Sequence, residues 1–192
     1  MKGGDIKVEL KKLIFNRMKK LSLLVLLALT LGLKGQKGKT FPQMVGINLN
    51  DKIINLPFNN GKFTVIAIAY NKQAEDELKK WLNPLYNLFM KKDKGGSTFD
   101  MAEIYDVNFV FIPMISGFKK IVEDFKKGTD KEFWPYIMDT EKTDIKAIQK
   151  QLQIEDNKIP YFYVLDKSDI IIEALNGKYA EEKMDLLEEA VD

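Results

Sequence analysis

The chain has 192 residues, of which 45% are hydrophobic and 11% aromatic, enough for one domain with a substantial core. Its formal net charge is +2, but the first 40 residues contain ten basic and two acidic residues, so they carry +8 and the rest carries −6. There is no cysteine and no histidine. Thiol redox chemistry and zinc sites built on Cys or His are therefore excluded, as is a histidine acid or base.

The N-terminal part of the chain contains an uncharged apolar run at residues 21–33 (LSLLVLLALTLGL), directly after Met-Lys-Lys at 18–20. Thirteen residues are fewer than the ~20 that a membrane-spanning helix needs. A basic start, a short apolar run and a small residue, Gly35, before Gln36 are typical of an export signal. We therefore predict a leader at 1–35, either a signal peptide or an uncleaved membrane anchor. A buried helix of the domain and a basic nucleic-acid arm are alternatives.

Residues 36–40 (QKGKT) are predicted to be a basic linker before a folded domain at 41–192. The β-branched run at 64–70 (TVIAIAY) predicts a buried strand. From Ala74 to Phe89, apolar residues recur every three or four positions, which predicts an amphipathic helix that Pro84 should kink. Residues 91–97 are predicted to form an exposed loop.

The second half repeats this alternation of strands and helices. Strands are predicted at 107–115, 134–139, 161–165 and 170–174, the last two as a hairpin. Helices are predicted around 118–125, 145–152 and 180–191 from the spacing of their apolar residues. This order predicts an α/β domain with a mixed central sheet and helices on both faces.

Three features resemble the thioredoxin-like superfamily over residues 41–192. The strand at 64–70 leads at once into a proline-containing helix, as in thioredoxin and the TlpA-like periplasmic proteins. Residues 158–162 (KIPYF) enter a strand, turn and strand where the family has its cis-proline, and Asn176-Gly177 precedes a final helix. The resemblance implies a three-layer α/β/α sandwich with a mixed sheet, here preceded by a hydrophobic leader helix.

The chain departs from this family at its redox motif, Cys-x-x-Cys, which belongs at the start of the helix near Ala74. Alignment on the strand places the motif at Ala74 to Glu77, whereas alignment on Pro84 places it at Asp76 to Lys79. Neither register has a thiol. The resemblance therefore implies a degenerate redox-motif region containing Ala74, Asp76, Glu77 and Lys79, with no catalytic residue.

A second set of residues carries a narrower resemblance: Phe41-Pro42, Gly46, Leu49, Leu56-Pro57, Trp81, Pro84 and Ile112-Pro113-Met114, together with the stretch 161–166. These residues resemble a cysteine-free group that includes the mitochondrial ATP synthase assembly factor called ATPase complex subunit ten. This group is thought to act as a chaperone-like assembly protein, so the resemblance implies a scaffold for binding.

Two segments are candidates for a binding surface. Asn71, Lys72 and Gln73 occupy the junction of strand and helix, where helix amides can bind an anion or a partner carboxylate; an ordinary solvated turn is the alternative. In the family, the residue before the cis-proline, here Ile159, exposes backbone groups that can pair with a peptide strand. Pro160 is thus the cis-proline candidate, or else a plain proline at the entry of a strand.

Other chemistries receive little support from the sequence. Glu75, Asp76 and Glu77 complement the dipole of the predicted helix, and neighbouring helical positions diverge too much for an acid–base pair. There is no EF-hand or phosphate-loop spacing, and no basic residues interleave with the aromatic ones as nucleic-acid binding requires. We expect no metal, no cofactor and no nucleic acid.

The sequence therefore predicts an exported, redox-inactive thioredoxin-like protein that binds a protein or peptide partner in a chaperone-like or assembly role. Membrane contact is expected only through the leader. The alternatives are a carboxylate- or metal-dependent enzyme on the same scaffold and a membrane-tethered domain.

Overall fold

The computed structural model describes residues 35–90, 105–113, 119–140 and 143–192. The leader predicted at 1–35, apart from Gly35, lies outside the described residues, as does the loop predicted at 91–97. Within the described ranges, no helix combines the length and the apolar character needed to cross a membrane.

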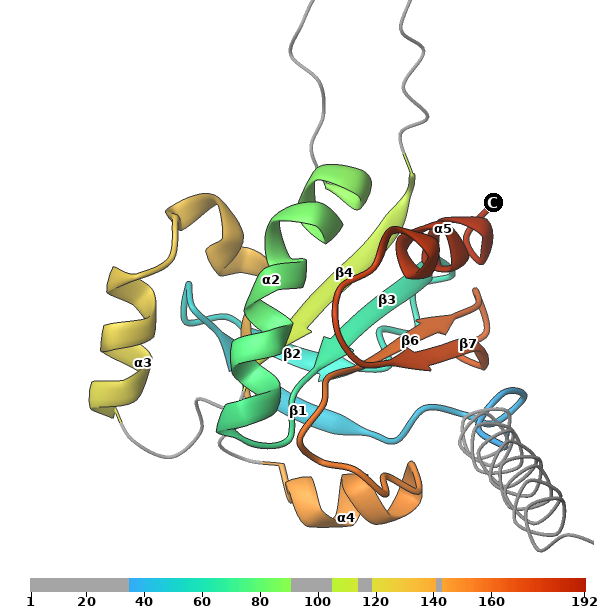
Figure 1. Ribbon diagram of the computed structural model, residues 1–192, viewed down its shortest axis with the longest axis horizontal. Helices are drawn as coiled ribbons and strands as arrows, with labels where there is room; N and C mark the ends of the chain where they lie inside the picture. The colour runs from blue at the N-terminus through green and yellow to red at the C-terminus, as the bar shows by residue number, and fades with distance from the viewer. Residues whose placement is uncertain (1–34, 91–104, 114–118, 141–142) are drawn as a thin grey trace, which may run out of the picture. The chain divides into compact units, whose positions relative to one another are not determined.

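The centre of the domain is a four-stranded sheet in the order β4-β3-β6-β7 (Figure 1). Its strands are β3 (Phe63–Ile68), β4 (Val107–Ile112), β6 (Tyr161–Leu165) and β7 (Ile171–Asn176). Strand β3 runs parallel to β4 and antiparallel to β6, and β6 and β7 form a hairpin. The mixed sheet and the C-terminal hairpin predicted from the sequence are thereby confirmed.

A second, three-stranded sheet in the order β2-β1-β5 adjoins β4 through a single bridge between Phe111 and Ile137. It consists of β1 (Met44–Asn48), β2 (Ile53–Leu56) and β5 (Met138–Asp139). The β1–β2 hairpin was not predicted from the sequence, although burial alternates along both strands. Gly46 is required here, because a Cβ would lie 2.2 Å from the backbone oxygen of Asp139.

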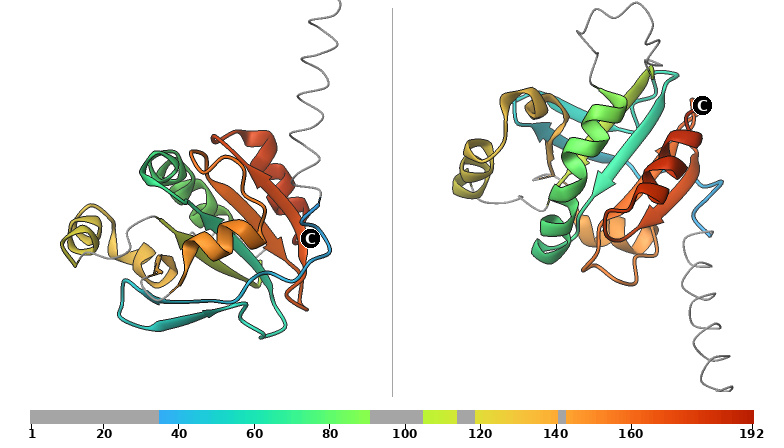
Figure 2. Two further views of the ribbon diagram at one scale, coloured as in Figure 1. Left: turned by 90° about the horizontal axis from the view of Figure 1, so that it is seen from below. Right: turned by 45° about the horizontal axis from the view of Figure 1, so that its top comes forward.

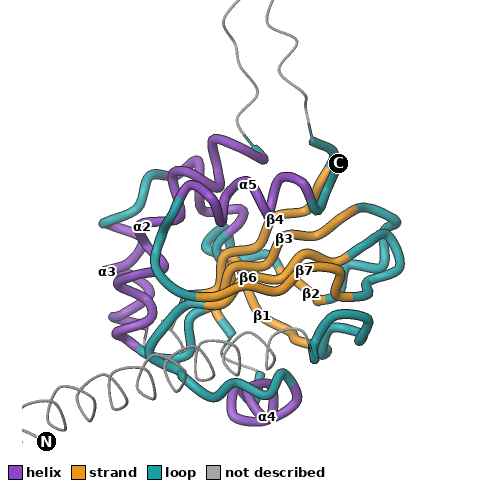
Figure 3. Tube along the Cα trace, turned by 45° about the vertical axis from the view of Figure 1, so that its right-hand side comes forward, coloured by secondary structure: helices purple, strands orange, loops and turns teal. Residues whose placement is uncertain are grey.

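Helices cover both faces of the central sheet. Figures 2 and 3 show α2 (Lys72–Phe89) and α5 (Glu181–Glu189) on one side and α4 (Ile145–Gln151) on the other. Trp81 of α2 and Leu187 of α5 are fully buried in one cluster with Phe162 of β6. Helix α2 begins two residues before the predicted Ala74 and continues through Pro84 to Phe89.

The segment at 36–40, predicted to be a linker, is instead part of the folded domain. Gly38 N–H donates to Ile171 C=O at 2.8 Å, and Ile171 N–H donates to the C=O of Lys39 at 2.9 Å. The Gln36 amide, 2% exposed, donates to the C=O of Leu152. The reason is that β7 is an edge strand whose outward backbone groups need partners. The folded unit therefore starts at Gln36.

The segment between β4 and α4 contains α3 (Lys119–Lys127) and a 3₁₀ helix, η1 (Lys131–Tyr136). Of the strand predicted at 134–139, only Met138–Asp139 forms as β5. Pro135 lacks the N–H that a strand ladder uses, and the indole N–H of Trp134 donates to the C=O of Thr129 at 3.0 Å. These contacts favour a tight helical turn.

Candidate functional site

The start of α2 is set by Asn71. Its side-chain oxygen accepts a hydrogen bond from Ala74 N–H at 2.9 Å and its C=O accepts one from Glu75 N–H at 3.0 Å, which is N-cap geometry. The helix N–H groups of Lys72 and Gln73 have no hydrogen-bond partner among the described residues. Two donors at the positive end of the helix dipole therefore remain available to a ligand.

The loop before β6 lies beside this helix start. The amide of Asn71 donates to the side-chain oxygen of Asn157 at 3.0 Å, although the two residues are 86 positions apart. Tyr161 contacts the same loop, because its hydroxyl donates a hydrogen bond to the C=O of Asp156 at 3.0 Å. The structure thus places the loop that leads to Ile159 and Pro160 beside the start of α2; binding at either segment stays a prediction.

The cis bond predicted before Pro160 is absent: the only cis peptide bond among the described residues joins Leu56 and Pro57. A trans bond is the intrinsically favoured form before proline, by ~0.5–1 kcal/mol. Pro160 is buried, and its C=O accepts a hydrogen bond from Gly177 N–H at 2.9 Å. Ile159 is half-buried and directly follows the turn at 157–158, and its C=O has no hydrogen-bond partner in the described part of the chain.

The predicted degenerate redox-motif region does not form a cluster. Ala74 is fully buried as the third residue of α2, whereas the Asp76 side chain is 64% exposed. Glu77 is paired with Lys80 at 2.9 Å. Helix α2 begins at Lys72, two residues before Ala74, the first residue of the registers proposed from sequence; the registers themselves stay predictions.

One residue that the sequence analysis underrated is Glu75, whose side chain is 2% exposed. It forms ion pairs of 2.8 Å with both Lys72 and Lys79. The hydrogen bond to Glu75 raises the pKa of Lys72. Lysines at three positions before and four positions after a glutamate are the spacing that could have revealed this cluster. The carboxylate is thus neutralised by two cations, and within the described residues no acidic cluster is arranged to hold a metal ion.

Three tyrosines lie under the site. Tyr70, immediately before the N-cap, packs its ring against Tyr161 with centroids 5.8 Å apart. The hydroxyls of Tyr70 and Tyr163 are buried without a well-formed hydrogen bond. Burial raises the pKa of both phenols, and the Tyr70 hydroxyl adds to the rise at Tyr163. Both phenols are therefore neutral at physiological pH and serve as core.

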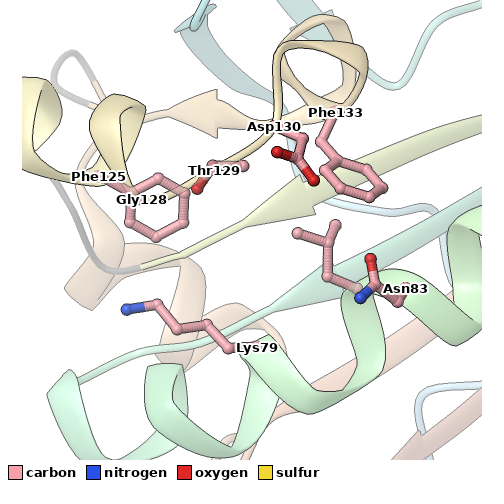
Figure 4. Close-up of a pocket in the computed structure, with 8 residues that line it drawn as sticks. Lys79, Asn83, Phe125, Gly128, Thr129, Asp130 and Phe133 are labelled. Carbon is pink, nitrogen blue, oxygen red and sulfur yellow. The ribbon is translucent and has the colours of Figure 1, made fainter.

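A cleft of about 320 Å³ lies further along α2, between that helix and the α3–η1 segment (Figure 4). Its apolar lining is Leu82, Phe125 and Phe133, and Lys79 lies 5.0 Å from the centre of the Phe125 ring. Lys79 is also paired with Glu75. The cleft and the helix start are thus linked through one lysine.

Comparisons with known proteins address the fold. No family model and no curated protein sequence matches the chain. The thioredoxin domain of a thiol-disulfide oxidoreductase from Bacteroides vulgatus superposes with a TM-score of 0.57 at 18% identity, covering 81% of this chain and 98% of that domain. A thiol:disulfide interchange protein from Bacteroides sp. superposes with a TM-score of 0.53 at 21% identity, covering 81% of this chain and 90% of that one. The chain has a thioredoxin-like fold.

The chain has the thioredoxin-like fold without any cysteine. The solved neighbours are named for thiol-disulfide exchange, which requires a thiolate, and this chain has no cysteine at any position. At the start of α2 stand Asn71, Lys72, Gln73 and Ala74. This thioredoxin-like domain therefore lacks the thiols that disulfide exchange requires, and its helix α2 begins at a capped, exposed end.

Proposed function

We propose that this protein is a redox-inactive thioredoxin-like domain that binds a protein or peptide partner at a junction surface, defined here as residues 71–73 together with the loop 155–159. The observation that carries the proposal is the Asn71–Asn157 hydrogen bond, which joins the two segments. The N–H groups of Lys72 and Gln73 and the C=O of Ile159 lie in these segments and have no hydrogen-bond partner among the described residues. A peptide backbone or a carboxylate could satisfy them.

The chemistry of the surface indicates the kind of partner. Lys72 is 70% exposed, and residues 155–158 (EDNK) are exposed and charged or polar. Such a surface favours recognition by hydrogen bonds and charge over burial of apolar side chains. Catalysis by carboxylates is a weaker candidate, because Glu75, Asp76 and Glu77 are each paired with a lysine.

Site-specific crosslinking tests this function. A photoreactive amino acid at Gln73, which is exposed, should capture a discrete partner in cells of the source organism, and Lys72→Glu should abolish the capture. The matched control places the same group at Lys80, an exposed position of the same helix that lies outside the surface. Equal capture at both positions would contradict the proposal. Hydrolase activity lost in Glu75→Gln would instead favour the enzyme alternative.

Export is part of the same proposal, and the leader at 1–35 supports it through its basic start and its apolar run at 21–33. N-terminal sequencing of the native protein distinguishes the possibilities. A chain that begins near Gln36 is a cleaved, exported domain. A chain that retains residues 21–33 is anchored or not exported, and an intact leader in the soluble fraction would contradict export.

A further inference from the structure

The sequence contains two Asn-Gly pairs, Asn60-Gly61 and Asn176-Gly177. In such pairs the glycine N–H can attack the asparagine side chain, because glycine offers no Cβ to hinder the approach. The reaction releases ammonia and makes a cyclic succinimide. The local structure decides whether it proceeds, since the backbone nitrogen must be free and the side-chain carbonyl must be polarised.

At Asn60 the side-chain oxygen is held by two donors. Asn108 Nδ2 donates to it at 2.9 Å and the N–H of Lys62 at 3.3 Å. The Asn60 amide in turn donates to Asn108 Oδ1 at 3.0 Å. Hydrogen bonds of this kind stabilise negative charge that develops on a carbonyl oxygen during attack.

The attacking group at this site is unhindered. Gly61 is exposed, has a φ of +73°, and a Cβ built on it would have no atom within 4 Å. Its N–H has no hydrogen-bond partner among the described residues. The nucleophile is thus both accessible to water and uncommitted.

The second pair is protected by its position at the end of β7. Gly177 N–H donates to the C=O of Pro160 at 2.9 Å. The C=O of Asn176 accepts from Lys183 Nζ at 2.8 Å. Attack by Gly177 therefore first requires loss of a hydrogen bond within the fold.

We infer that Asn60 is a site of spontaneous deamidation, and that Asn176 is protected. Gly61 N loses its proton to solvent and bonds to Cγ of Asn60, placing negative charge on Oδ1 beside Asn108 Nδ2 and Lys62 N–H. The bond from Cγ to Nδ2 then breaks, and Nδ2 leaves as ammonia after taking up a proton. Water opens the succinimide to aspartate or isoaspartate, with no oxidation or reduction.

The product changes a contact between the β2–β3 turn and β4. A carboxylate at position 60 cannot donate to Asn108 Oδ1, so the reciprocal amide pair loses one of its two hydrogen bonds. Asn108 also donates to the hydroxyl of Thr64, which is buried in β3. The modified protein should therefore melt at a lower temperature than the unmodified protein.

Peptide mapping by mass spectrometry of the full chain, incubated at mildly alkaline pH, tests the inference. Asn60 should be converted roughly tenfold faster than Asn176, the factor that corresponds to a hydrogen bond of ~1.4 kcal/mol. In urea the two rates should converge. Equal rates in the folded protein, or a preference for Asn60 that persists in urea, would overturn the structural argument.

The variant Asn108→Asp separates polarisation from simple exposure. It keeps an acceptor for Asn60 Nδ2 but removes the donor to Oδ1. Conversion at Asn60 should slow at least about threefold, less than the ~100-fold of a buried oxyanion donor, because the site is open to water. Faster conversion would mean that Asn108 restrains Asn60 and would refute the mechanism. Each measurement compares Asn60 with Asn176 in the same protein. Partial unfolding of the variant would therefore be recognised, because it would raise the conversion rates of both asparagines.

Discussion

The start of α2 can be tested by giving the protein a single thiol. Because the chain has no cysteine, Asn71→Cys carries the only one, placed where the Asn71 oxygen accepts from Ala74 N–H at 2.9 Å. Asn87→Cys is the matched control, an exposed asparagine in the last turn of the same helix. The two variants expose one thiol to opposite ends of one helix dipole.

The expected shift follows from the helix dipole, which contributes ~0.3–2 kcal/mol to a charge at a helix end. At ~1.36 kcal/mol per unit, this lowers the pKa of the thiol at position 71 by ~0.2–1.5 units from ~8.5. The same dipole raises the pKa of the thiol at position 87. The ammonium of Lys72, adjacent to Asn71, should add to the lowering.

The assay is the rate of alkylation by iodoacetamide as a function of pH, because the inflection gives the thiol pKa directly. This avoids comparing rates alone, since a thiolate becomes a weaker nucleophile as its pKa falls. Urea unfolding of each variant checks that the helix is intact. A pKa at position 71 equal to or above that at position 87 would refute the view that α2 begins with an exposed, positively polarised end.

Three further predictions concern stability. Gly46→Ala should lower the free energy of unfolding in urea by ~1–3 kcal/mol, because the new methyl group overlaps the β5 backbone; an unchanged midpoint would contradict this. Glu75→Gln should lower the free energy of unfolding by about 1 kcal/mol, and this loss should become smaller at high salt. The same variant should lower the pKa of Lys72, which NMR can follow. A loss of stability that does not depend on salt would indicate that Glu75 acts through packing and not through charge. Tyr70→Phe and Tyr163→Phe should each change stability at pH 7 by less than ~1 kcal/mol, because neither hydroxyl makes a well-formed hydrogen bond. Both phenol pKa values are raised in the folded state, so the two tyrosines do not destabilise the protein below pH ~10. Above that pH the unfolded chain ionises its tyrosines first, and the free energy of unfolding falls as pH rises. Each variant removes one such phenol and should therefore weaken the loss of stability at alkaline pH.

The central elements could be predicted because their signals are local. The run at 64–70 is apolar and β-branched, and the apolar residues of 74–89 fall on one helix face, so each segment reveals its structure without its neighbours. The β1–β2 hairpin was not predicted because its strands are short. Gly46, which the close approach of β5 requires, also weakens the alternation of apolar and polar residues in β1. Likewise, residues 36–40 resemble a linker until the edge of β7 supplies partners for them.

The candidate binding surface stays a prediction from the sequence. The sequence could not show that Asn71 bonds to Asn157, since that contact depends on how β3 and β6 pair. The sequence placed the start of the helix two residues too late, at Ala74 instead of Lys72, because the first residue of a helix depends on its cap. It also expected a cis bond at Pro160, where the structure has trans.

By itself, the sequence determined which chemistry is impossible, since a thiol or an imidazole is present or absent whatever the fold. It also determined the order of the four central strands and of the helices α2 to α5, because hydrophobic periodicity is local. The tertiary structure decided that α2 begins at a capped, exposed end beside the loop at 155–159, and that Glu75 lies buried between two lysines. Contacts between residues distant in the chain arise only when the sheet assembles, and these contacts define the surface proposed to bind a partner.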